Sequence, residues 1–201
     1  MIKLNLLKLQ EKFEEARKPI FSPQDIKLFF AASDRAINGF LTYNSQKKRI
    51  IKLKKSLYAL KKSDTNHFAI ANRAYQPSYI SFETALSYYH LIPETVYSIT
   101  SATSQTSRQF DIQNINYSYR KIKKNAYTGY LINTTESQPI LIASPEKAVA
   151  DYCYFILLGK IGSWNDRLDL RKIKLEKVRQ YLSLFGDQKF INRLKKYLPD
   201  L

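Results

Sequence analysis

The sequence of 201 residues contains one cysteine, two histidines and no long apolar run. Because a single cysteine, Cys153, cannot form an internal disulfide, it is typical of a reducing compartment, and we expect a cytoplasmic protein. No stretch approaches the roughly 18 uninterrupted apolar residues that a membrane-spanning helix needs. Lys3 and Lys8 also interrupt the apolar residues at the N-terminus, so we expect neither a membrane span nor a signal peptide.

Motifs for common catalytic chemistries are also missing. There is no glycine-rich phosphate loop, no paired-histidine zinc motif and no nucleophile elbow. His67 and His90 lie 23 positions apart without a cysteine or carboxylate spacing that would join them in a metal site. Cys153 falls on an apolar helix face, where a buried thiol is expected. We therefore expect no catalytic residue, metal site or cofactor. A nucleic-acid-processing enzyme that uses its basic surface for docking remains the lesser alternative.

Acidic residues are scarce relative to basic ones. The chain has 33 Lys and Arg against 17 Asp and Glu, a net charge of +16. Residues 1–66 hold 15 basic and 6 acidic side chains, a net of +9, whereas residues 67–160 carry +2 and the remainder +5. The densest basic run, without an acid among its charges, is Lys47, Lys48, Arg49, Lys52, Lys54, Lys55, Lys61 and Lys62. This run favours contact with nucleic-acid phosphates over a merely solubilising surface.

Three helices are predicted ahead of the basic run. Apolar residues at helical spacing predict a helix over residues 2–15, ended before Pro19. Ser22-Pro23 predicts a short helix that reaches Phe30, and Ser33-Asp34 caps a third helix.

The third helix is the most informative element. Ile37, Phe40 and Leu41 form its apolar face. Its polar stripe consists of Arg35, Asn38, Thr42 and Ser45, with Gln46 beside it. These side chains suit base edges and phosphates, and two short helices joined by a tight turn predict a helix-turn-helix. The alternative is an ordinary polar surface on a core helix.

A β-hairpin is predicted after the third helix. Residues 50–53 and 57–60 are apolar runs on either side of the basic turn Lys54-Lys55-Ser56. Three helices followed by a basic hairpin predict a winged helix whose wing lies along phosphates. The predicted DNA-binding residues are Ser33, Arg35, Asn38, Thr42, Ser45, Gln46, Lys48, Arg49, Lys52, Lys54 and Lys55.

We predict an α+β protein with a winged helix-turn-helix domain over residues 1–63 and a mixed α+β domain over residues 64–201 that ends in helices. The second domain is expected to contain helices over 67–74 and from Ser81 to Tyr89, strands over 96–103, 112–122, 127–132 and 140–143, a helix beginning at Ser144-Pro145, and helices near 174–185 and 187–198. Glu83, Asp111 and Asp151 show no pairing in the sequence.

Several short motifs, in order, resemble the AbiEi antitoxins of type IV toxin–antitoxin systems. They are the winged helix, residues 79–86 (YISFETAL), residues 90–94 (HLIPE) and residues 144–151 (SPEKAVAD). Residues 55–60 resemble the family's wing strand, with Ser56 where glycine is common, and residues 125–131 resemble its central strand. The resemblance covers roughly residues 10–160.

The resemblance implies a bacterial repressor that binds inverted repeats in its own operon and whose C-terminal domain neutralises a nucleotidyltransferase toxin. By this resemblance we expect a shorter C-terminal part than in the longer members of the family. We therefore expect a sequence-specific double-stranded DNA-binding transcription regulator, an autoregulating antitoxin. The alternatives are a protein-interaction module with secondary DNA binding and an orphan regulator without a toxin. Either a dimer or two monomers could meet inverted repeats.

Overall fold

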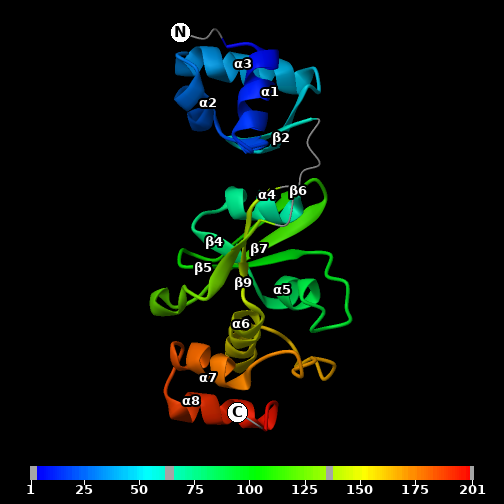
Figure 1. The fold of residues 1–201 in the computed structure, drawn as a ribbon, viewed down its shortest axis with the longest axis vertical. Helices are drawn as coiled ribbons and strands as arrows, with labels where there is room; N and C mark the ends of the chain where they lie inside the picture. Colours follow the sequence, from blue (N-terminus) through cyan, green and yellow to red (C-terminus); the bar gives the residue numbers. More distant parts are fainter. Residues whose placement is uncertain (1–3, 62–65, 135–137, 200–201) are drawn as a thin grey trace. The chain divides into compact units, whose positions relative to one another are not determined.

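The computed structural model describes residues 4–61, 66–134 and 138–199 (Figure 1). It divides into two compact units, Met1–Ala74 and Tyr75–Leu201. The domain boundary expected between residues 63 and 64 lies outside the described residues. The helix after it, α4 (His67–Ala74), belongs to the first unit. No helix within the described residues is both long and apolar enough to cross a membrane.

The described part of the first unit combines four helices with a small antiparallel sheet. Its elements before α4 are α1 (Leu6–Glu15), β1 (Ile20–Phe21), α2 (Pro23–Phe29), α3 (Asp34–Gln46), β2 (Ile50–Lys54) and β3 (Leu57–Leu60). The sheet has the order β1-β3-β2. Leu9 and Phe13 of α1 pack with Ile37 and Leu41 of α3 in one buried core. Burial of these apolar faces holds the helices against the sheet.

Local capping explains where the helices begin. Asn5 accepts a hydrogen bond from the Lys8 amide, so α1 starts at Leu6. Of the helix predicted over residues 2–15, residues 2 and 3 lie outside the described part of the chain, and Leu4 and Asn5 precede the helix. Ser22 and Asp25 form a capping box at the start of α2, with Pro23 in its first turn. Ser33 caps α3 through the Ala36 amide. The predicted second and third helices are confirmed.

The predicted hairpin is also confirmed. β2 and β3 pair antiparallel, with Ile50 opposite Leu60 and Lys52 opposite Tyr58. Lys55 and Ser56 form the turn, and Ser56 has a positive φ of 59°. The two-residue strand β1 was not predicted, because its strand conformation depends on pairing with the distant β3.

The second unit is built around a six-stranded mixed sheet of order β6-β7-β5-β4-β9-β8. Its strands are β4 (Ser78–Ile80), β5 (Ile99–Thr103), β6 (Arg108–Ile112), β7 (Ile115–Lys121), β8 (Tyr130–Asn133) and β9 (Ile140–Ala143). Its helices are α5 (Phe82–Tyr88), α6 (Pro145–Leu157), α7 (Leu175–Ser183) and α8 (Gln188–Asn192), with 3₁₀ turns at Lys124–Ala126 and Arg193–Lys196. β5 runs parallel to β7, and β4 runs parallel to β9.

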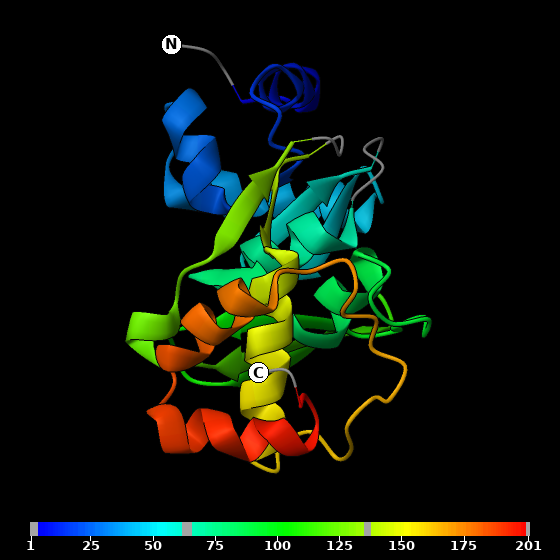
Figure 2. The ribbon, with the colours of Figure 1, turned by 60° about the horizontal axis from the view of Figure 1, so that its bottom comes forward.

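The helix α6 connects the helical part to the sheet. It begins after Ser144, which accepts a hydrogen bond from the Lys147 amide. Its Phe155 ring meets Phe82 of α5 edge-on at 4.9 Å, and α7 packs along its other side (Figure 2). The predicted helix from Ser144 is confirmed, and the α+β class is confirmed with it.

Several predicted strand bounds were wrong. β5 begins at Ile99, not Val96, because its ladder with β7 starts at the pair Ile99 and Tyr117. β6 lies between two predicted strands, where no strand was expected, because an edge strand tolerates polar side chains that are poor strand signals. The long strand predicted over 112–122 is split by a turn at Gln113-Asn114, where both residues have positive φ.

Other elements were predicted in part. The strand expected over 127–132 is β8, which begins only at Tyr130, after a 3₁₀ turn and Gly129 at a positive φ of 76°. The short strand β4 was not predicted at all. The last predicted helix, 187–198, is α8 followed by the second 3₁₀ turn.

Candidate nucleic-acid interface

Helix α3 separates an apolar face from an exposed polar face. Ile37 and Leu41 are fully buried. The side chains predicted to read DNA lie on the exposed side at helical spacing: Arg35, Asn38, Thr42 and Gln46, with Ser33 exposed at the N-cap. The structure therefore brings five of the six predicted helix residues onto one accessible stripe or its N-terminal end.

Ser45 is the exception on α3. It is half-buried, and its hydroxyl oxygen is buried without a hydrogen-bond partner in the described part of the chain. Its helical position places it between the core face and the exposed stripe. Ser45 therefore does not join the exposed stripe as predicted.

Two residues that were not predicted also lie on the exposed stripe. Gly39 is exposed at its middle, between Asn38 and Thr42, and Tyr43 is 53% exposed one turn further on. The sequence contained the signal for both, because positions 35, 39 and 43 are four apart and share a helix face. The accessible surface of α3 is therefore continuous from Arg35 to Gln46.

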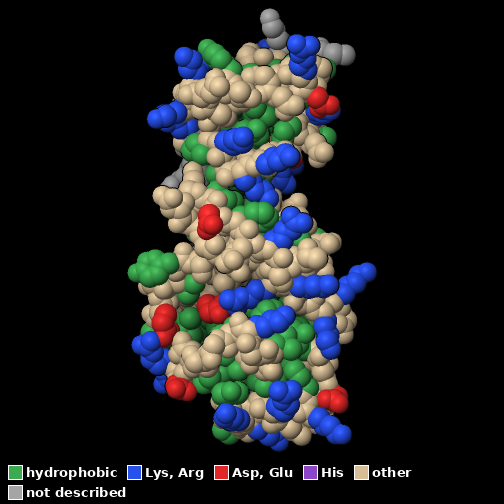
Figure 3. Space-filling view, turned by 180° about the vertical axis from the view of Figure 1, so that it is seen from behind, with side chains coloured by type: hydrophobic (Ala, Val, Ile, Leu, Met, Phe, Trp, Pro, Cys, Tyr) green, Lys and Arg blue, Asp and Glu red, His purple; other side chains and the backbone are tan. Residues whose placement is uncertain are grey.

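The hairpin and the turn before it carry exposed cations. Lys48, Arg49, Lys52 and Lys55 are all exposed. The Arg49 amide donates to the Asn44 carbonyl oxygen at 2.9 Å, so the turn after α3 is fixed to the helix that precedes it. On the visible face of the first unit, Lys and Arg side chains predominate over acidic ones (Figure 3). These four cations are the part of the predicted phosphate-binding set that is free to meet solvent.

Lys54 differs from the other predicted cations. It is half-buried, and its ammonium group donates a hydrogen bond to the Ala74 carbonyl oxygen at the C-terminal end of α4. A cation at this end satisfies a terminal carbonyl group and interacts favourably with the helix dipole. Lys54 therefore fastens the hairpin to α4 and is the least available of the predicted set for a phosphate.

A second contact fastens α4 to α2. Arg73 donates to the Asp25 carboxylate at 2.6 Å, and that carboxylate also accepts from Ser22. Burial opposes ionisation of Asp25, but the Ser22 hydrogen bonds and the Arg73 charge outweigh it and lower the carboxyl pKa. The hairpin and the start of α2 are thus both held by α4.

The second unit contains a buried polar cluster that the sequence analysis missed. The Asp151 carboxylate accepts hydrogen bonds from the Lys147 ammonium, from the Tyr79 hydroxyl at 3.0 Å and from the Ser81 hydroxyl at 2.7 Å. All four side chains are shielded from solvent. Burial raises the pKa of Asp151, although each partner opposes this. Because the carboxylate has three hydrogen-bond donors and the cluster is shielded from solvent, these contacts hold β4 against α6. Its sequence signal was the spacing of four between Lys147 and Asp151.

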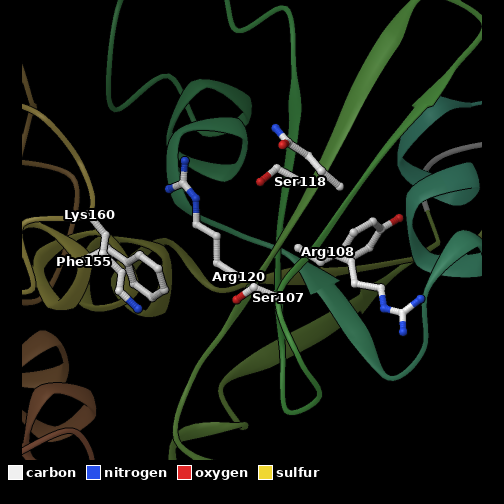
Figure 4. A pocket seen from close by; sticks show the side chains of 8 residues that line it. Ser107, Arg108, Ser118, Arg120, Phe155 and Lys160 are labelled. Atoms are coloured by element: carbon white, nitrogen blue, oxygen red, sulfur yellow. The ribbon is translucent and has the colours of Figure 1, made fainter.

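A hollow of about 490 Å³ lies beside β6 and β7 (Figure 4). Arg120 points toward α5, where Glu83 binds its guanidinium at 2.9 and 3.1 Å. Arg108 points the other way, because it stands on the opposite face of the β6–β7 ladder. The arginines therefore do not converge on a common ligand position.

No group of metal-ligating residues gathers anywhere in the ranges that the structure describes. Cys153 is fully buried, as predicted, and burial raises the pKa of its thiol far above the ordinary value. A protonated, inaccessible thiol is unsuited to act as a nucleophile.

Comparison with known proteins adds no assignment. No family model matches this chain, and no curated protein sequence matches it.

Proposed function

We propose that the first unit is a winged helix-turn-helix that binds double-stranded DNA in a sequence-specific manner. In this proposal α2 and α3 form the helix-turn-helix, α3 enters the major groove, and the β2–β3 hairpin is the wing. The main support is the placement of the exposed side chains. Arg35, Asn38 and Thr42 lie on one accessible surface of α3, and the turn and hairpin that follow α3 carry exposed cations. Forked and amide side chains read base edges, whereas cations hold phosphates.

Charge placement supports DNA over other ligands. Residues 1–66 carry a net charge of +9, and Lys48, Arg49, Lys52 and Lys55 are all exposed. This positive charge attracts any polyanion. The polar face of α3 also supplies the hydrogen-bonding groups that recognition of bases needs. We therefore propose that the protein is a transcription regulator.

The test is duplex selection followed by affinity measurement. The full chain is incubated with a randomised duplex pool, and binding to the selected duplex and to unselected duplex is measured over a range of salt concentrations. We expect tighter binding to the selected duplex and a steep fall of affinity with salt for both. Absence of salt-dependent duplex binding would refute the proposal.

A second role, binding of a protein partner, is favoured by the outer strand β8. Leu131 and Ile132 are 55% and 68% exposed on this strand, which among the described residues pairs with β9 and with no strand on its other side. An uncharged apolar edge strand is suited to pair with another chain. In line with the AbiEi resemblance, we propose a nucleotidyltransferase toxin as that partner, so that the protein acts as an autoregulating antitoxin. Co-purification with a nucleotidyltransferase encoded next to its gene, lost on Leu131→Lys, tests this role. Absence of any such complex would favour the orphan regulator.

A further inference from the structure

Gly39 lies in the interior of α3, where glycine is unfavourable for the helix. Glycine loses more conformational freedom on folding than alanine and is one of the poorest helix formers. Gly39 is the sixth residue of a helix that runs from Asp34 to Gln46, so it is neither an N-cap nor a C-cap. A structural reason for this glycine would have to come from its backbone or its neighbours.

Neither the backbone conformation of Gly39 nor its surroundings require a glycine. The backbone of Gly39 is helical, unlike that of Gly129 and Gly159, which have positive φ. No atom of the described chain beyond its own helical turn and adjacent residues lies within 4 Å of the Cβ that alanine would add. At Gly186, by contrast, the Phe190 side chain would be only 2.6 Å from such a Cβ. The space over Gly39 is therefore open.

The position of the open space is informative. Gly39 is exposed at the centre of the stripe that Arg35, Asn38, Thr42 and Tyr43 border. Longer side chains at these four positions surround a point where the helix backbone itself is uncovered. Glycine is the residue that permits close approach of a backbone to a ligand. A helix lying in the major groove is the case in which a base edge comes that close.

We infer that Gly39 is a specificity-determining residue: its bare backbone lets α3 seat against the base-pair edges, so that Asn38 and Thr42 reach them. This inference rests on the proposed DNA binding. A methyl group at position 39 would lift the helix from the bases but leave the phosphate contacts of the hairpin, which lie on another element. The substitution should therefore reduce sequence preference more than overall attraction to DNA.

The test is Gly39→Ala in the full chain, with Gly162→Ala as the matched control. A Cβ at Gly162, in the second unit, would also have no atom within 4 Å. Binding is measured with the duplex selected by the wild-type protein and with unselected duplex, and hydrogen exchange reports the amides of α3. We expect the preference for the selected duplex to fall about tenfold or more, because losing one well-formed base contact has an effect of that size. Binding to unselected duplex and its salt dependence should be unchanged. The α3 amides should be as protected as in the wild type, or more so, because alanine favours the helix.

Each other outcome counts against the inference. If Gly39→Ala retains the wild-type preference, the glycine has no role in recognition, although the proposed DNA binding stands. If the α3 amides lose protection, the glycine is required by the fold. If the control loses preference equally, the effect is not specific to α3. If the wild-type protein itself binds no duplex, the inference and the proposed function both fail.

Discussion

Removal of the two accessible hairpin lysines is the most direct test of the phosphate contacts. Lys52 and Lys55 are exposed, whereas the ammonium of Lys54 is bound to the Ala74 carbonyl oxygen. The double variant Lys52→Ala/Lys55→Ala should therefore lose about two phosphate contacts. Since each contact contributes about 0.9 to the slope of log affinity against log salt, the slope should become shallower by about 1.8.

That change has a large effect on affinity. When the salt concentration is raised fourfold, the ratio of wild-type to variant affinity should shrink by about 12-fold, because a slope difference of about 1.8 applies over that range. Fluorescence anisotropy with a labelled duplex at several salt concentrations measures this directly. Unselected duplex should give the same change as the selected one, since phosphate contacts carry no sequence information.

Two further variants make the test specific. Lys172→Ala/Lys177→Ala removes the same charge from exposed positions of the second unit and should leave the slope unaltered. Lys54→Ala should also leave the slope unaltered but lower the free energy of unfolding by about 1 kcal/mol through the lost hydrogen bond. A double hairpin variant with the wild-type slope, or a Lys54 variant with an equally reduced slope, would refute the assignment of these contacts.

Three other predictions concern single residues. Asn38→Ala should reduce the preference for the selected duplex by about 1–3 kcal/mol if the amide makes a bidentate base contact, and equal losses on both duplexes would contradict this. Asp25→Asn should lower stability at neutral pH and flatten its acid dependence. Because the pKa of Asp25 is lowered in the folded protein, its carboxylate contributes to the free energy of unfolding above the pKa of the unfolded chain, and this contribution is lost as the pH falls below about 4. Identical acid unfolding curves for the variant and the wild type would refute this contribution. Lys147→Ala should destabilise the second unit by about 3–5 kcal/mol in urea, because it leaves the Asp151 carboxylate buried without its cation. A much smaller loss would contradict an uncompensated charge at Asp151 in the variant.

Elements with local signals could be predicted from the sequence. Ser22-Pro23, Ser33-Asp34 and Ser144-Pro145 each place a capping hydroxyl before a helix, and all three helices begin where these residues indicate. The apolar runs around Lys54-Lys55-Ser56 likewise identify the hairpin. In these cases a few neighbouring residues determine the conformation.

Elements that depend on distant pairing could not be predicted in the same way. β4 has three residues and is a strand because β5 and β9 lie on either side of it. β6 contains Arg108, Gln109 and Asp111, which suit a solvent-facing edge but are poor strand signals by themselves. The turn at Gln113-Asn114 was missed because glutamine rarely adopts the positive φ that it has there.

Helical periodicity predicts which side chains of α3 face solvent, and to that extent the candidate site could be predicted from the sequence. Arg35, Asn38 and Thr42 lie on the expected face because the core residues of α3 fix its rotation. Ser45 is half-buried because it lies at the border of that face, where helical spacing alone does not decide whether a side chain is exposed. Gly39 could not be predicted from donors and acceptors, because glycine has no side chain to supply either.

Lys54 shows why a count of charges overstates the cations available to DNA. Within the hairpin, Lys52, Lys54 and Lys55 are equivalent in composition, yet one of them binds the C-terminal carbonyl of α4. That contact fixes β2, the strand that carries Lys52 and that Lys55 directly follows. Lysine thus has two roles in this hairpin. Lys52 and Lys55 supply positive charge at the surface, whereas Lys54 holds the hairpin in place. Sensitivity of affinity to salt should therefore follow the exposed lysines alone, and resistance of the hairpin to unfolding should follow Lys54.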